Sequence, residues 1–154
     1  MIKHLLKASR SLSQRTGIAV YARHYGLNHA GRLIEPIFQT GISKHHSIYL
    51  GVDALGTEWI AENHKFNGVR LVKALDFFRN KNDITVEGFS GEYRERVAAV
   101  KRALSLLGKS YDLISYNCEH YASYVQTGKA ESRQVSTLFA LVLAALFIGI
   151  AIKD

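Results

Sequence analysis

The chain reads YNCEHY over residues 116–121, and this stretch holds its only cysteine. A predicted helix follows the polar pair Tyr116-Asn117 and runs to about Thr127, where Gly128 is suited to end it. Cys118 therefore falls in the first helical turn, where the positive end of the helix dipole favours a nucleophilic thiolate. A lone cysteine is more often an inert core thiol, but that role predicts a position in the middle of a helix. The placement favours a nucleophile.

A cysteine nucleophile needs a base, most often a histidine from elsewhere in the fold. His45 and His46 immediately precede a predicted strand, SIYLGV over residues 47–52. Neighbouring residues on a strand point to opposite faces, so at most one of these imidazoles is expected to face Cys118. Glu62 and His64 end the next predicted strand on one shared face, where either could orient the base.

The remaining pattern predicts a single α+β domain with an antiparallel sheet packed on helices. His45 is expected on a central strand, beside the helix that carries Cys118. Residues 17–44 give no clear pattern. The other predicted elements are strands over 58–62, 69–72 and 84–89, a helical turn over 75–78, and an amphipathic helix over 90–107 with Ser90 as its N-cap.

The charge composition of the chain indicates what kind of partner it binds. The net charge is +7, and no Asp or Glu occurs before Glu35 in a stretch that is rich in Lys and Arg. This excess predicts an anionic partner. No nucleic-acid recognition motif accompanies it, so an anionic membrane surface fits better than nucleic acid. A single cysteine also excludes a disulfide framework and a Cys-rich zinc site, and no metal or cofactor is expected.

The two ends of the chain suggest how it would meet a membrane. Residues 1–16 have the pattern of a basic amphipathic helix, and residues 137–152 read TLFALVLAALFIGIAI without a charge. The sequence therefore predicts three parts: the N-terminal helix, a catalytic domain over 17–136, and a C-terminal membrane anchor over 137–152. The basic excess before the anchor predicts a cytoplasmic domain. The alternative for 137–152 is a buried helix or one that joins copies in a homo-oligomer.

The cysteine segment also carries a resemblance. NCEHY over 117–121, Gly128-Lys129 and SRQV over 132–135 closely resemble the NCEHF…GK…S..QV signature of the lecithin:retinol acyltransferase-like family. HHSIYLG over 45–51 resembles the family's histidine strand and places the catalytic histidine on His45. This family is a circularly permuted branch of the papain-like NlpC/P60 superfamily, related to phospholipase A/acyltransferase proteins. Its animal members have a histidine twelve positions after the first, where this chain has Thr57, so His64 is favoured as third residue, with Glu62 close behind.

The resemblance implies two-step acyl transfer, in which Cys118 forms a thioester and water or an amine then takes the acyl group. The expected function is a thiol acyltransferase or phospholipase A that acts on membrane glycerophospholipids. Two alternatives remain open at this point. One is an NlpC/P60-type cysteine peptidase or amidase, and the other is a non-catalytic membrane-interaction module.

Overall fold

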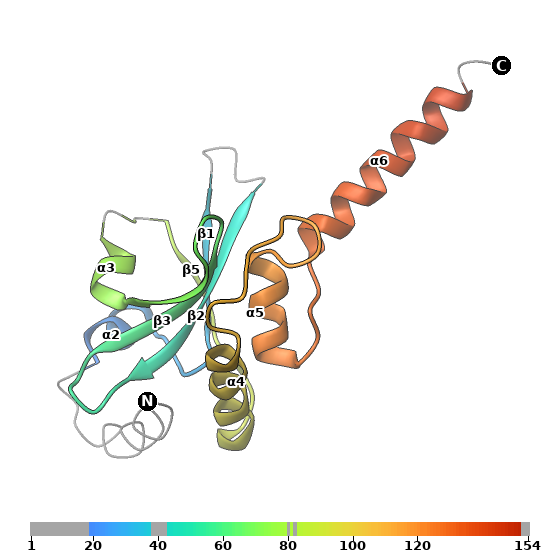
Figure 1. Cartoon of the computed structure of the whole chain (residues 1–154). Helices are drawn as coiled ribbons and strands as arrows, with labels where there is room; N and C mark the ends of the chain where they lie inside the picture. The colour runs from blue at the N-terminus through green and yellow to red at the C-terminus, as the bar shows by residue number, and fades with distance from the viewer. Residues whose placement is uncertain (1–18, 38–42, 80, 82, 152–154) are drawn as a thin grey trace.

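The computed structural model describes residues 19–37, 43–79, 81 and 83–151, and the predicted helix over 1–16 lies outside this part of the chain. An antiparallel five-stranded sheet forms its centre, in the order β4-β3-β2-β1-β5. The strand that carries the paired histidines, β2, is therefore central, as predicted (Figure 1). The strands are β1 (Arg32–Pro36), β2 (Lys44–Val52), β3 (Glu58–His64), β4 (Gly68–Lys73) and β5 (Thr85–Glu87).

Two turns set the register of the central strands. Asp53 closes the turn between β2 and β3, because its Oδ1 accepts the amides of Leu55 and Thr57 at 2.9 Å each. The turn between β3 and β4 ends on Gly68, whose φ is +65°. A Cβ atom at Gly68 would lie 2.3 Å from the carbonyl oxygen of Lys109, so this position requires glycine both for its conformation and for its space. Both turns join strands that the sequence predicts.

One face of the sheet is covered by α4 (Tyr93–Ser105) and α5 (Cys118–Thr127). Ile48 and Ala61, which pair across β2 and β3, point into this layer and are fully buried. They pack with the apolar sides of the two helices, including Val100, Tyr121 and Val125. This burial fixes α5 against the central strand, and so fixes the position of its first residue, Cys118.

The opposite face is covered by α2 (Val20–Tyr25) and α3 (Ala74–Phe78). Tyr49 and Ile60 alternate with the residues of the first face and pack there with Phe77 and Phe78. The carboxylate of Glu58 ties this layer together, accepting the Tyr49 hydroxyl at 2.9 Å and two backbone amides at the start of α2. Two helical layers therefore sandwich the strand that carries the histidines.

The long helix of the first layer begins later than the sequence predicts. Ser90 was the predicted N-cap, but Glu92 precedes the first helical residue, Tyr93. Glu92 and Glu95 form a capping box, with the Glu92 amide donating to Glu95 Oε2 at 2.7 Å. The reciprocal pair of bonds satisfies two amides at once, which explains why it prevails over the serine.

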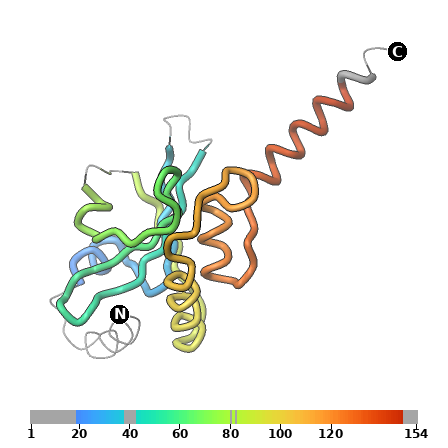
Figure 2. Tube along the Cα trace, viewed as in Figure 1, coloured from blue at the N-terminus to red at the C-terminus, as the bar shows by residue number. Residues whose placement is uncertain are grey.

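The last helix, α6 (Arg133–Ala151), leaves the domain and extends away from it (Figure 2). Its described apolar side chains are largely exposed on all sides of the helix, from Leu138, at 55% exposure, to Phe147, at 72%. Within the residues that the structure describes, no helix is both long enough and apolar enough to cross a membrane. The predicted membrane span over 137–152 is therefore not supported.

Candidate active site

Asn117 positions the cysteine by capping α5. Its side-chain Oδ1 accepts the amides of Glu119 and His120 at 2.9 and 3.1 Å, and its own amide donates to His120 Nδ1 at 3.3 Å. The side-chain nitrogen of Asn117 donates in turn to the Leu113 carbonyl and the Ser132 hydroxyl. These bonds make Cys118 the first helical residue, with 4% of its surface exposed. The predicted placement of the thiol in the first turn is confirmed.

His45 lies between Cys118 and a buried carboxylate. Its Nε2 contacts Glu62 Oε2 at 2.7 Å, and the imidazole also hydrogen-bonds the Cys118 side chain. Since Nε2 is occupied by Glu62, Nδ1 is the nitrogen left to exchange a proton with the sulfur. Arg70 holds the other oxygen of the same carboxylate, donating through Nε and Nη2 at 2.8 and 2.7 Å. The result is a chain of contacts from Arg70 through Glu62 and His45 to Cys118.

The charges of this chain favour a protonated imidazole. Burial disfavours the charged form of His45, but hydrogen bonds and charge interactions with Cys118 and Glu62 outweigh it and raise its pKa to about 9. Burial likewise opposes ionisation of Glu62, yet His45 and Arg70 lower the pKa of this carboxyl to about 2. An imidazole that holds a proton in this way can give it to a leaving group.

The edge of β2 next to His45 has no paired strand on the β3 side, and this leaves room for Cys118 beside the imidazole. Pairing between β2 and β3 begins only at Ser47 and Glu62, so the first residues of β2 have no strand partner on that side. The amide and carbonyl of Lys44 point into this gap. There the carbonyl accepts from Cys118 Sγ at 3.7 Å, and the side chain of Gln134 bonds both groups, at 2.9 and 3.2 Å.

The side-chain amide of Gln134 takes the place of a neighbouring strand, because it accepts from the backbone amide of Lys44 and donates to its carbonyl. Gln134 also donates through its backbone and side-chain nitrogens to Glu119 Oε2, at 3.0 and 3.3 Å. Glu119 directly follows the cysteine and Lys44 directly precedes the histidine. The first turn of α6 is in this way bonded to both sides of the Cys118–His45 pair.

The other two candidate histidines, His64 and His46, do not contact the Cys118–His45 pair in the described hydrogen bonds. His64 lies at the end of β3, where its Nδ1 accepts the Phe66 amide at 3.3 Å and its ring packs against the ring of Phe66. The structure thus puts Glu62, rather than the favoured His64, against the His45 imidazole. His46 points to the face covered by α5, as its alternation with His45 predicts. Burial is the main cause that lowers the pKa of His46 to about 4.

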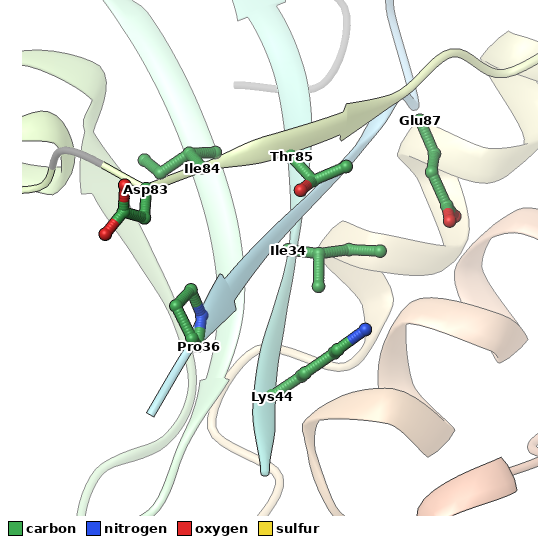
Figure 3. Close-up of a pocket in the computed structure, with 7 residues that line it drawn as sticks. All are labelled: Ile34, Pro36, Lys44, Asp83, Ile84, Thr85 and Glu87. Carbon is green, nitrogen blue, oxygen red and sulfur yellow. The ribbon is translucent and has the colours of Figure 1, made fainter. Parts of the chain in front are cut away.

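Two neighbouring cavities open on the α5 face of the sheet, and Cys118 and His45 line neither of them. The smaller, of about 520 Å³, lies where β1, β2 and β5 meet (Figure 3). The larger, of about 890 Å³, lies between the sheet, α5 and α6. The two cavities share Ile34, Lys44 and Glu87, and Lys44 directly precedes the histidine.

Sequence reasoning missed two members of this site. Arg70 was not identified because nothing local marks it, although it pairs with Glu62 in the β3–β4 register. Gln134 was noted only as part of a family motif, since its bonds to Lys44 span 90 residues. Both depend on strand register and on the path of the chain after α5, and neither has a local signature.

A search of curated proteins found no match to the chain. The family model described as lecithin retinol acyltransferase does match, over residues 28–131. That range covers roughly two thirds of the chain, from just before β1 to just before α6, and includes Cys118, His45 and Glu62. The chain belongs to the lecithin retinol acyltransferase family.

Proposed function

We propose that this protein is a cysteine-dependent acyltransferase or phospholipase A acting on membrane glycerophospholipids. Membership of the family suggests acyl-transfer chemistry in general. The observation that carries the finer proposal is the contact of one partly buried imidazole with both Cys118 and Glu62. That arrangement supplies a nucleophile, a base and a group that orients the base, which are the parts that acyl transfer through a thioester needs.

In the first step, His45 holds the proton that Cys118 gives up, and the thiolate attacks the ester carbonyl carbon. The carbonyl electron pair moves to oxygen and forms a tetrahedral oxyanion. When the pair returns, the bond to the alkoxy oxygen breaks and that oxygen takes the proton from His45. A lysophospholipid leaves, and the acyl group remains on the sulfur as a thioester.

The oxyanion needs a donor near the sulfur. Asn117 already takes the amides of Glu119 and His120, so we assign this role to the preceding amide, that of Cys118 itself. In the second step, His45 removes a proton from water or an amine, which attacks the thioester carbonyl carbon. The carbon–sulfur bond then breaks, the fatty acid or amide leaves, and the sulfur takes the proton back from His45. Glu62 stays ionised throughout and fixes the imidazole, because Arg70 and His45 both lower the pKa of its carboxyl.

The lipid surface is proposed to hold the protein through α6. This helix exposes apolar side chains all round, and within the described residues no packed layer of the domain covers them. Lys129 and Arg133 are exposed at its base, where they would meet anionic headgroups. Lipid around α6 would thereby lie directly beside Gln134 and the cysteine.

The test is acylation of the full-length protein by a phospholipid carrying a labelled acyl chain, presented in vesicles. Intact-protein and peptide mass spectrometry should find one added acyl group on Cys118, and hydroxylamine should remove it as it removes thioesters. Release of labelled fatty acid should follow the same time course. Turnover that persists in Cys118→Ser, or an acyl group found on another residue, would contradict the proposal.

A further inference from the structure

The larger cavity is built by residues that strand register brings to one face. Arg32 and Ile34 of β1 lie on the same face as Lys44 and His46 of β2, because Ile34 pairs with His46 and Pro36 with Lys44. The α5 residues Glu119 and Ser123 close one side, and Thr137, Leu138 and Leu141 of α6 close another. A molecule in this cavity would lie against the neighbours of both reacting residues, since Lys44 precedes His45 and Glu119 follows Cys118.

Three cationic side chains line this cavity: Arg32, Lys44 and Arg133. Among the described residues, none of the three forms an ion pair. Arg32 is half-buried and donates only its Nε, to Gln126 at 3.1 Å. Burial is the main cause that lowers the pKa of Arg32; the negative charges of Glu87 and Glu119 raise it, and the positive charge of Arg133 lowers it. The three cations repel one another, and an anion placed between them would reduce that repulsion.

Three carboxylates also line the cavity, those of Glu87, Glu119 and Glu131, and two of them act on Arg32. Glu119 Oε2 already accepts bonds from Ser132 and Gln134. Glu87 and Glu131 are exposed, as are Lys44 and Arg133, so solvent and salt screen the charges of all four, whereas Arg32 is half-buried. His46 contributes a neutral imidazole that is 5% exposed, and its Nδ1 has no hydrogen-bond partner in the described part of the chain.

The opposite wall is apolar. Leu138 and Leu141 of α6 are 55% and 64% exposed and face the cavity, with Ile34 on the sheet side. The cavity thus offers cations at one wall and apolar side chains at another. A free inorganic anion would use only the first wall, whereas a phosphodiester attached to glycerol and acyl chains would use both.

We propose that this cavity binds the phosphate of the lipid whose ester Cys118 attacks, with Arg32, Lys44 and Arg133 as its cationic ligands. The inference rests on the proposed function, because it assigns a recognition site to the same reaction. In a glycerophospholipid only a few bonds separate the phosphate from the ester carbonyl. Phosphate held beside Lys44 and Glu119 would therefore bring that carbonyl to the sulfur.

The test uses the full-length protein in a glycoside detergent without phosphate, with Arg133→Gln and Arg32→Gln as variants. The matched control is Arg94→Gln, an exposed arginine on α4 outside the site. Each is assayed on a soluble short-chain phosphatidylcholine and on a neutral short-chain ester without phosphate. For both cavity variants, kcat/KM should fall about tenfold more on the phospholipid than on the neutral ester, which is typical for losing one charge-assisted hydrogen bond.

A binding measurement separates this inference from the proposed function. Titration calorimetry with glycerophosphocholine should show binding that Arg133→Gln weakens about tenfold and Arg94→Gln does not. If the wild type turns over neither ester but still shows this binding pattern, the proposed function fails and the site stands. Equal losses on both esters, or unaltered binding in Arg133→Gln, would overturn the site. Inorganic phosphate binding as tightly as the phosphodiester would show an anion site that is not specific to lipid.

Discussion

At the residue scale, the proposed reaction depends on Cys118 as nucleophile and on His45 as its base. Cys118→Ser and His45→Ala should each reduce turnover of a soluble ester by at least about 10²- to 10⁴-fold. That range is the usual contribution of a positioned acid–base group. The far-ultraviolet circular dichroism should be unchanged. His24→Ala, an exposed histidine on α2, is the matched control. Equal activity in the His45 and His24 variants would remove His45 from the mechanism.

Glu62 is expected to set the upper pH limit of activity. Its carboxylate helps to raise the pKa of His45 to about 9, so a proton stays on the imidazole at neutral pH. Glu62→Gln removes that charge, and the pKa of His45 should fall toward the ordinary value. The alkaline limb of the kcat/KM profile should therefore move to lower pH. The same shift in His64→Gln, with none in Glu62→Gln, would mean that His64 is the orienting residue.

At the scale of elements, the first turn of α6 is expected to align the active site through Gln134. Gln134→Ala removes both side-chain bonds to Lys44 and one to Glu119, which should cost about 1–3 kcal/mol of unfolding free energy. Urea unfolding measures that loss. Ser136→Ala, which removes only a local bond to the Ser132 carbonyl, is the control on the same helix.

The activity of the same variant distinguishes alignment from stability. If Gln134 positions Lys44, and with it His45, kcat should fall at temperatures where the variant is fully folded. Gln134→Asn, which keeps the amide on a shorter stem, should restore little of it. Full kcat in a folded Gln134→Ala variant would limit this residue to a structural role.

The remainder of α6 is expected to bind lipid. Phe147 is 72% exposed on this helix, and Phe66 is 82% exposed in the turn between β3 and β4. Phe147→Asp should lower co-flotation with phospholipid vesicles, because a charge replaces an apolar side chain in the proposed lipid contact. Phe66→Asp should leave it unchanged. Flotation that is equal in both variants would place the lipid contact elsewhere.

At the scale of the whole molecule, the contact between His45 and Glu62 makes stability fall at both low and high pH. Glu62 has its pKa lowered from 4.5 to about 2, so its stabilising effect is present above about pH 4.5 and is lost as the pH falls through 2. His45 has its pKa raised from 6.5 to about 9, so its effect is complete below pH 6.5 and is lost as the pH rises through 9.

The contribution of His45 and Glu62 to stability should therefore be largest between about pH 4.5 and 6.5. Thermal unfolding midpoints measured from pH 3 to 10 test this. Glu62→Gln should flatten both limbs, because it removes one titrating group and the partner of the other. Limbs of unaltered slope in this variant would show that other groups control the pH dependence.

The local pattern of the sequence was sufficient for much of this molecule. Alternating and helical periodicity located β2, β3, β4, α4 and α5 to within a few residues. Gly128, in the left-handed conformation with φ +81°, ends α5 as predicted. These features depend on neighbouring residues alone. The same is true of Cys118 in the first turn, because the capping residue Asn117 stands directly before it.

What only the tertiary structure decided are the contacts between distant segments. The choice of Glu62 over His64 depends on where β2 begins to pair with β3, and both residues satisfy the strand alternation equally. Arg70 and Gln134 enter the site through strand register and through the path of α6. The gap beside Lys44, into which Cys118 fits, exists because β3 pairs no earlier than Ser47. Periodicity determines which face a side chain takes, whereas pairing between strands and packing between layers determine what it meets there.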